Sequence, residues 1–288
     1  MSTGLYVDNN ARRVDFAELQ SMRAPDATRS YRPLHFADQV TMVDRAVADL
    51  IDEPVTDRTL ALTHDGARFL GAWTVEREGQ ANLSLLAGGS WDKSTAAWIA
   101  RGASIKACTN GMVWGADFRS VRKNTTNVYP DARALIWDMV EGAQVAFEQS
   151  MQFADEISEI PCHDVRGAEI IGWAQYLGVL RPQQATVAFR EWKNPSHEEF
   201  APRTLWSLYN AFTEAVKRGP AASLVGRLAN GGNSVDAFMR DVQAKEQARA
   251  DFIQTARDCI REVYSARNLA APSAALPAPV AVAELIDN

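Results

Sequence analysis

The residues best suited to do chemistry lie between Trp91 and Thr125, where cations alternate with aromatic rings. Six basic and two acidic side chains give this stretch a net charge of +4, whereas the whole chain carries −6. Phosphates pair with cations and unpaired bases stack on flat rings, so this combination is typical of a surface that binds a single nucleic-acid strand. The predicted phosphate contacts are Lys93, Arg101, Lys106, Arg119, Arg122 and Lys123, and the predicted stacking rings are Trp91, Trp98 and Trp114.

The same residues also have a purely structural interpretation. Tryptophans in strands usually belong to the core, because each one buries a large apolar area. Lysines and arginines between them usually cover the solvated face of a half-buried sheet. The local reversal of charge keeps the nucleic-acid hypothesis open. About four phosphate contacts would make log affinity fall with log salt at a slope near −3.

Motifs for enzymatic chemistry are missing from the sequence. It contains no glycine-rich phosphate loop of the Walker or dinucleotide type, no Gly-x-Ser-x-Gly and no zinc-ligand spacing. The three cysteines (Cys108, Cys162 and Cys259) are odd in number and far apart, which argues against a disulfide framework. We therefore expect no enzyme, no metal and no cofactor. A nuclease built from scattered carboxylates stays an alternative.

Composition sets the class of protein that must position these residues. The chain has 288 residues, of which 47% are hydrophobic, enough for one large core or two smaller ones. It has no run of about 18 apolar residues, so no membrane span is expected. The N-terminal residues lack a basic-then-apolar signal pattern, which predicts a cytoplasmic protein.

The pattern of elements predicts an α+β fold. Apolar residues spaced three and four apart over 36–50 predict an amphipathic helix that ends before Pro54. Short strand signals separated by turns, among them Asp65-Gly66 and Asn110-Gly111, predict an antiparallel meander of five or six strands over 58–118. A mostly helical part follows over 130–269. It begins with one long amphipathic helix, which can start at Pro130, shows apolar periodicity from Leu135 and runs to Ile157.

The ends of the chain differ in composition from its middle. Residues 1–30 are polar with few apolar positions, and we expect a flexible N-terminal arm there. Alanine and proline dominate residues 270–288, which predicts a disordered tail. The segment between them, 31–269, is expected to form a single α+β domain.

Several short motifs resemble the phage- and plasmid-borne proteins of domain-of-unknown-function family 932. They are Tyr31-Arg32-Pro33-Leu34-His35, Ser90-Trp91-Asp92-Lys93-Ser94, Cys108-Thr109-Asn110-Gly111 and the nine residues from Trp206 to Glu214. The family usually has Ser-His-Asp-Gly at residues 90–93, so this chain departs from it at Trp91 and Lys93. The resemblance covers roughly residues 30–265 and implies a mobile genetic element. In its layout, a meander followed by a long helix, the chain is similar to single-strand annealing proteins of the lambda Red beta and eukaryotic recombination-mediator kind.

Two functions follow as hypotheses from different classes. The first is a single-stranded DNA binding or annealing protein that acts in DNA recombination or maintenance and assembles as a homo-oligomer. The second is an interaction protein of a mobile element that inhibits a host defence factor through a host protein partner. Neither hypothesis involves a membrane.

Overall fold

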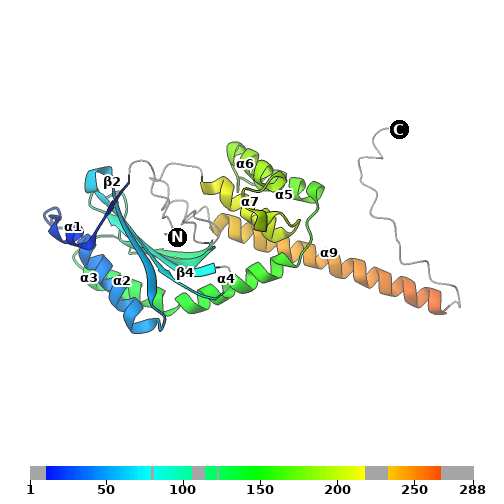
Figure 1. Ribbon diagram of the computed structural model, residues 1–288, viewed down its shortest axis with the longest axis horizontal. Helices are drawn as coiled ribbons and strands as arrows, with labels where there is room; N and C mark the ends of the chain where they lie inside the picture. Colours follow the sequence, from blue (N-terminus) through cyan, green and yellow to red (C-terminus); the bar gives the residue numbers. More distant parts are fainter. Residues whose placement is uncertain (1–10, 79–80, 106–113, 122, 218–232, 267–288) are drawn as a thin grey trace. The chain divides into compact units, whose positions relative to one another are not determined.

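The computed structural model describes residues 11–78, 81–105, 114–121, 123–217 and 233–266, and its elements follow the predicted α+β order (Figure 1). The chain divides into two compact units, residues 1–241 and residues 242–288. The strands are β1 (Arg12–Val14), β2 (Val55–Thr63), β3 (Arg68–Val75), β4 (Ala81–Ser90), β5 (Trp98–Ile105) and β6 (Trp114–Ser120). The helices are α1 (Phe16–Ser21), α2 (Phe36–Leu50), α3 (Val128–Glu141), α4 (Ala143–Ser158), α5 (Asp164–Tyr176), α6 (Pro182–Lys193), α7 (Leu205–Lys217) and α9 (Asn233–Ala266), with 3-10 turns η1 (His64–Gly66) and η2 (Glu198–Phe200).

The six strands form one antiparallel sheet in the order β1-β2-β3-β4-β5-β6, so the predicted meander is confirmed. Asp65 and Gly66 both have positive φ in the tight connection between β2 and β3, as the Asp-Gly pair predicts. Residues 12–14 pair with β2, and residues 16–21 form α1. This ordered structure corrects the expectation of a flexible arm for that part of residues 1–30.

Helices α2, α3 and α4 run along one face of the sheet (Figure 1). The Trp73 indole of β3 donates a hydrogen bond of 2.7 Å to Asp44 of α2. On β5, the Arg101 guanidinium donates one of 3.0 Å to the Met139 carbonyl of α3. Register places Trp73 opposite Leu85 and Leu85 opposite Arg101, so all three side chains share the face that the helices cover.

The single long helix predicted from Pro130 to Ile157 is two helices, α3 and α4, which meet at Gly142. The residue at the junction is glycine for a steric reason. A Cβ at Gly142 would lie 2.1 Å from Arg101 Nη1, so this position has no room for a side chain while Arg101 contacts the end of α3. Apolar periodicity continues through the break and therefore does not reveal it.

The remaining helices of the first unit pack around aromatic side chains. Trp173 of α5 meets Phe238 of α9 edge to face, with 5.5 Å between ring centres. The hydroxyl of buried Tyr209 donates a hydrogen bond to Asp236, which ties α7 to the start of α9. In the second unit, residues 242–266 continue α9 as a helix with an exposed Phe252. The predicted disordered tail, 270–288, lies outside the described residues.

Candidate functional site

A pocket of about 300 Å³ lies where three separate segments of the first unit meet. Its lining residues are Ser30, Tyr31, Lys93, Thr95, Ala96, Lys123 and Asn124. The segments converge because the residues just beyond them pack in one buried apolar cluster, which includes Leu34, Ala97 and Val121. The pocket therefore brings two of the predicted phosphate contacts together, although they lie 30 positions apart in the sequence.

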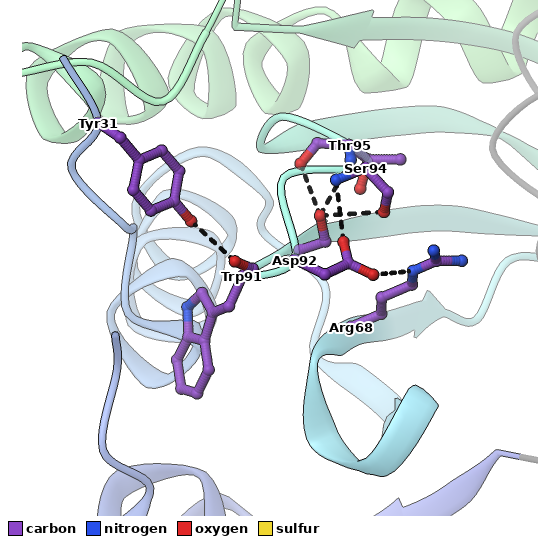
Figure 2. Close-up of polar contacts among 7 residues, drawn as sticks. Tyr31, Arg68, Trp91, Asp92, Ser94 and Thr95 are labelled. Atoms are coloured by element: carbon purple, nitrogen blue, oxygen red, sulfur yellow. Dashed lines mark hydrogen bonds and ion pairs between the residues drawn. The ribbon is translucent and has the colours of Figure 1, made fainter. Parts of the chain in front are cut away.

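Ser90 holds the connection between β4 and β5 in shape. Its buried Oγ accepts a hydrogen bond of 2.9 Å from the Thr95 backbone N–H and one of 3.2 Å from the Ser94 hydroxyl. The Ser90 hydroxyl in turn donates to the Thr95 carbonyl at 3.0 Å. These bonds close residues 90–95 into a tight loop, which Figure 2 shows beside Tyr31.

Asp92 lies within this loop and is bound on both carboxylate oxygens. One oxygen accepts from Arg68 Nε at 2.8 Å and the other from the Ser94 backbone N–H at 2.9 Å (Figure 2). Burial alone would raise the pKa of Asp92, but hydrogen bonds from Ser94, Ser90 and Arg68 outweigh it and hold the pKa well below its usual value. Asp92 is therefore ionised at neutral pH, and its charge is paired with Arg68.

Lys93 follows Asp92 with a φ of 65°, a left-handed backbone that residues other than glycine seldom adopt. Its ammonium lies 4.8 Å from the centre of the Tyr31 ring, close enough for a cation–π contact. The Tyr31 hydroxyl donates a hydrogen bond of 3.4 Å to the Trp91 carbonyl. Burial raises the pKa of Tyr31, a hydrogen bond with Asn124 lowers it and the charge of Asp92 raises it further. Tyr31 therefore enters the site as a neutral ring.

Lys123 is exposed and enters the pocket from the segment between β6 and α3. The next residue, Asn124, anchors that segment. Its side-chain oxygen accepts from the Ala97 backbone N–H at 3.1 Å, and its backbone carbonyl accepts from the Arg32 N–H at 3.0 Å. Asn124 thus links the residue before β5, the residues before α2 and Lys123.

Two of the predicted stacking rings contribute to packing instead. Trp91 is half-buried and lies parallel to Phe36, with 3.9 Å between ring centres, while its indole N–H donates to the Leu34 carbonyl at 2.9 Å. Trp98 is only 3% exposed and crosses the backbone of Gly88, where a Cβ would come within 2.7 Å of the indole. The structural interpretation therefore applies to Trp98, and no base can stack on it in this conformation.

Two of the predicted phosphate contacts bind α3 instead of facing the pocket. Arg101 donates to the carbonyls of Asp138 and Met139, at 3.4 and 3.0 Å. Arg119 forms an ion pair of 2.8 Å with the Asp138 carboxylate. A helix C-terminus and a carboxylate both attract cations, so these two arginines stabilise the contact between sheet and helix.

The other predicted contacts cannot be placed. Lys106 and Arg122 lie outside the described residues, and for Trp114 the structure describes its place in β6 but not its side chain. Sequence reasoning missed the other five lining residues, Ser30, Tyr31, Thr95, Ala96 and Asn124. Of these, Tyr31 belongs to a motif that was compared with family 932, but nothing in the sequence shows that the segments meet.

Comparison with known proteins adds no identification. No family model matches the chain, and neither a curated protein nor a solved structure matches it. The resemblance to family 932 therefore stays a prediction. In the described part of the chain, no three His, Cys, Asp or Glu side chains gather closely enough to hold a metal ion. Among the same residues, no helix combines the length and the apolar character needed to cross a bilayer.

Proposed function

We propose that this protein binds a single strand of DNA, with the phosphate backbone held by Lys93 and Lys123. The observation that carries the proposal is their convergence on one pocket, whose described lining contains two cations, the hydroxyls of Ser30 and Thr95, and no carboxylate. Ammonium and hydroxyl groups are common protein contacts to phosphate oxygens. The whole chain has a net charge of −6, so the positive charge of this pocket is opposite in sign to that of the protein.

The nearest acid of the loop does not offset the two lysines. Asp92 precedes Lys93, but its carboxylate is bound by Arg68 and by the Ser94 N–H. The Asp92–Arg68 pair is close to neutral as a unit. The pocket therefore keeps its positive charge in an acidic protein, which is what an incoming phosphate requires.

The geometry changes the expected strength of binding. Arg101 and Arg119 contact α3, so two phosphate contacts are expected from the described residues instead of about four. For a single strand, two contacts give a salt slope of about −1.4. Base stacking on Trp98 is no longer expected, because the ring is buried. The expected binding is independent of sequence and uses the phosphate backbone of the strand.

The test measures binding of a fluorescent oligothymidine by anisotropy at several salt concentrations. Lys93→Ala and Lys123→Ala should each weaken binding and each reduce the slope by about 0.7. Lys193→Ala on α6 removes an exposed lysine far from this loop in the sequence and serves as the charge-matched control, with unchanged binding expected. A wild-type protein without affinity for the strand at low salt, or an equal loss in all three variants, would contradict the proposal.

A protein partner is the second candidate, because apolar side chains are exposed on α5 and just after it. Val165, Tyr176 and Leu177 are 69%, 86% and 52% exposed in the first unit. Large apolar side chains exposed next to one another can mark protein-binding surfaces, and Tyr176 and Leu177 are neighbours in the chain. Replacing all three with serine should abolish capture of a host protein while leaving oligonucleotide binding intact, whereas alanine at Lys93 and Lys123 should have the reverse effect.

A further inference from the structure

The size of the pocket limits what can enter it. At about 300 Å³ it lies at the small end of ligand pockets in proteins. A strand lying across the surface would place only about one or two of its phosphates there. The shape is thus better suited to a single projecting group than to several consecutive nucleotides.

The charge of the pocket distinguishes between two kinds of phosphate. Lys93 and Lys123 bring two ammonium groups to one small space. A phosphodiester within a strand carries one negative charge. A phosphate monoester has a second pKa near 6 and carries close to two charges at neutral pH, with three acceptor oxygens. Two cations therefore match a monoester better than a diester.

The groups that would contact this phosphate come from a fixed frame. The Lys93 backbone is held by the Asp92–Ser94 turn and its ammonium lies over Tyr31. Asn124 holds the Lys123 segment against Ala97. The Thr95 backbone is bound to Ser90 on both its N–H and its carbonyl. Because less ordering remains to occur on binding, this frame favours a small, highly charged ligand.

We propose that the Lys93–Lys123 pocket binds a terminal phosphate monoester, the group at a phosphorylated end of a nucleic-acid strand. This inference rests on the proposed function and deepens it, because it places the end of the strand at the pocket and the remaining nucleotides outside it. The Ser30 and Thr95 hydroxyls donate to the phosphate oxygens beside the two ammonium groups.

The experiment compares four oligothymidines of one length: one phosphorylated at the 5′ end, one at the 3′ end, one with neither, and one whose 5′ phosphate is capped as its methyl ester. The methyl ester keeps the shape of the terminal group but has a single charge. One phosphorylated strand should bind at least about tenfold more tightly than the unphosphorylated strand, and which of the two does so identifies the end. The capped strand should lose most of the gain if the end is 5′.

Two variants locate the effect. Lys93→Gly keeps the left-handed backbone and removes the ammonium, and Lys123→Ala removes the other cation. Each should abolish the preference for the phosphorylated end, while Lys193→Ala should keep it. Equal affinity for all four strands would overturn the terminal-phosphate inference and leave strand binding intact. A preference that survives in both pocket variants would also overturn it, and no binding of any strand would remove both proposals.

Discussion

The Lys93 ammonium lies 4.8 Å from the centre of the Tyr31 ring, and the Lys93 backbone has a φ of 65°. The two facts belong together, because the left-handed turn directs the chain of Lys93 toward a residue 62 positions earlier in the sequence. Unusual backbone conformations of this kind cost free energy and persist where the surrounding contacts enforce them. Here the contacts of Ser90 and Asp92 supply that constraint.

The strain at Lys93 predicts that replacing it with glycine increases stability and weakens binding of the strand. Lys93→Gly should raise the free energy of unfolding, by up to about 1 kcal/mol, since glycine adopts positive φ without the steric penalty. Lys93→Ala keeps the strain and should show no such gain. Urea unfolding measures the stability of both variants, and both should bind oligonucleotide more weakly than wild type.

Asp65→Gly is the matched control, because Asp65 has a φ of 53° in the connection between β2 and β3. It should gain less stability than Lys93→Gly, since aspartate tolerates the left-handed region better, and it should bind oligonucleotide normally. A loss of stability in Lys93→Gly would show that the lysine side chain itself holds the loop.

The lowered pKa of Asp92 predicts that its contribution to stability depends on pH. Its pKa in the folded protein is lower than in the unfolded chain, where it is near the ordinary value of about 3.9. The carboxylate therefore stabilises the folded state above about pH 4, and this contribution is lost as the pH falls toward the folded pKa. Asp92→Asn should be less stable than wild type at pH 7, and the difference should shrink below about pH 4.

Unfolding by urea at a series of pH values between neutral and acid measures this difference. Arg68→Met tests one of the causes, after the larger ones from Ser94 and Ser90. It removes the Arg68 hydrogen bond to Asp92 and should reduce the pH dependence of stability in part over the same range. A difference between wild type and Asp92→Asn that stays constant over the whole series would show that the pKa of Asp92 is not lowered.

Local pattern was sufficient to predict most elements of the fold. The helix over 36–50 and the strands of the meander follow from apolar spacing and turn residues, and the α+β class is confirmed. Glycines were harder to interpret. The pair Gly88-Gly89 looks like a strand end in the sequence, but both glycines lie inside β4. Gly102 lies inside β5, at an irregularity in the pairing with β6. A glycine that admits a neighbouring ring or a bulge looks the same in sequence as one that ends a strand.

The site was only partly predictable for a different reason. Charge density identified the stretch that contains Lys93 and Lys123, but it does not distinguish them from Arg101 and Arg119. The choice depends on which face of a strand each side chain occupies and on which helix covers that face. Both are properties of the tertiary packing, as is the approach of Tyr31 to the loop.

Arg101 is predicted to be a structural residue that leaves binding unaffected when it is replaced. Arg101→Met removes hydrogen bonds to the carbonyls of Asp138 and Met139 and should lower the free energy of unfolding by about 1–3 kcal/mol. Arg119→Gln breaks an exposed ion pair with Asp138 and should cost less than about 1 kcal/mol. Both variants should keep wild-type affinity for oligothymidine. If Arg101→Met instead binds more weakly at unchanged stability, Arg101 contacts the nucleic-acid strand and the prediction is wrong.

Replacing glycine with alanine should lower the free energy of unfolding at Gly88 and raise it at Gly172. Gly88 tests the placement of Trp98, and Gly172 serves as the comparison. A Cβ at Gly88 would lie 2.5 Å from the Phe69 carbonyl oxygen and 2.7 Å from the Trp98 ring, so Gly88→Ala should lower the free energy of unfolding by about 1–3 kcal/mol. A Cβ at Gly172 on α5 meets nothing within 4 Å, and Gly172→Ala should raise it by about 0.5–1 kcal/mol through helix propensity.

Thermal and urea unfolding of the two glycine variants provide the comparison. The chain has eight tryptophans, so the emission of Trp98 is obtained as the difference between proteins with and without Trp98→Phe, measured in the wild-type and in the Gly88→Ala background. If Trp98 is packed across Gly88, the added methyl group must displace the ring, and the emission should shift toward that of solvent-exposed tryptophan. A Gly88→Ala protein as stable as wild type with unchanged emission would mean that Trp98 lies elsewhere. Its ring would then become available to stack a base, and the stacking role predicted from the sequence would regain support.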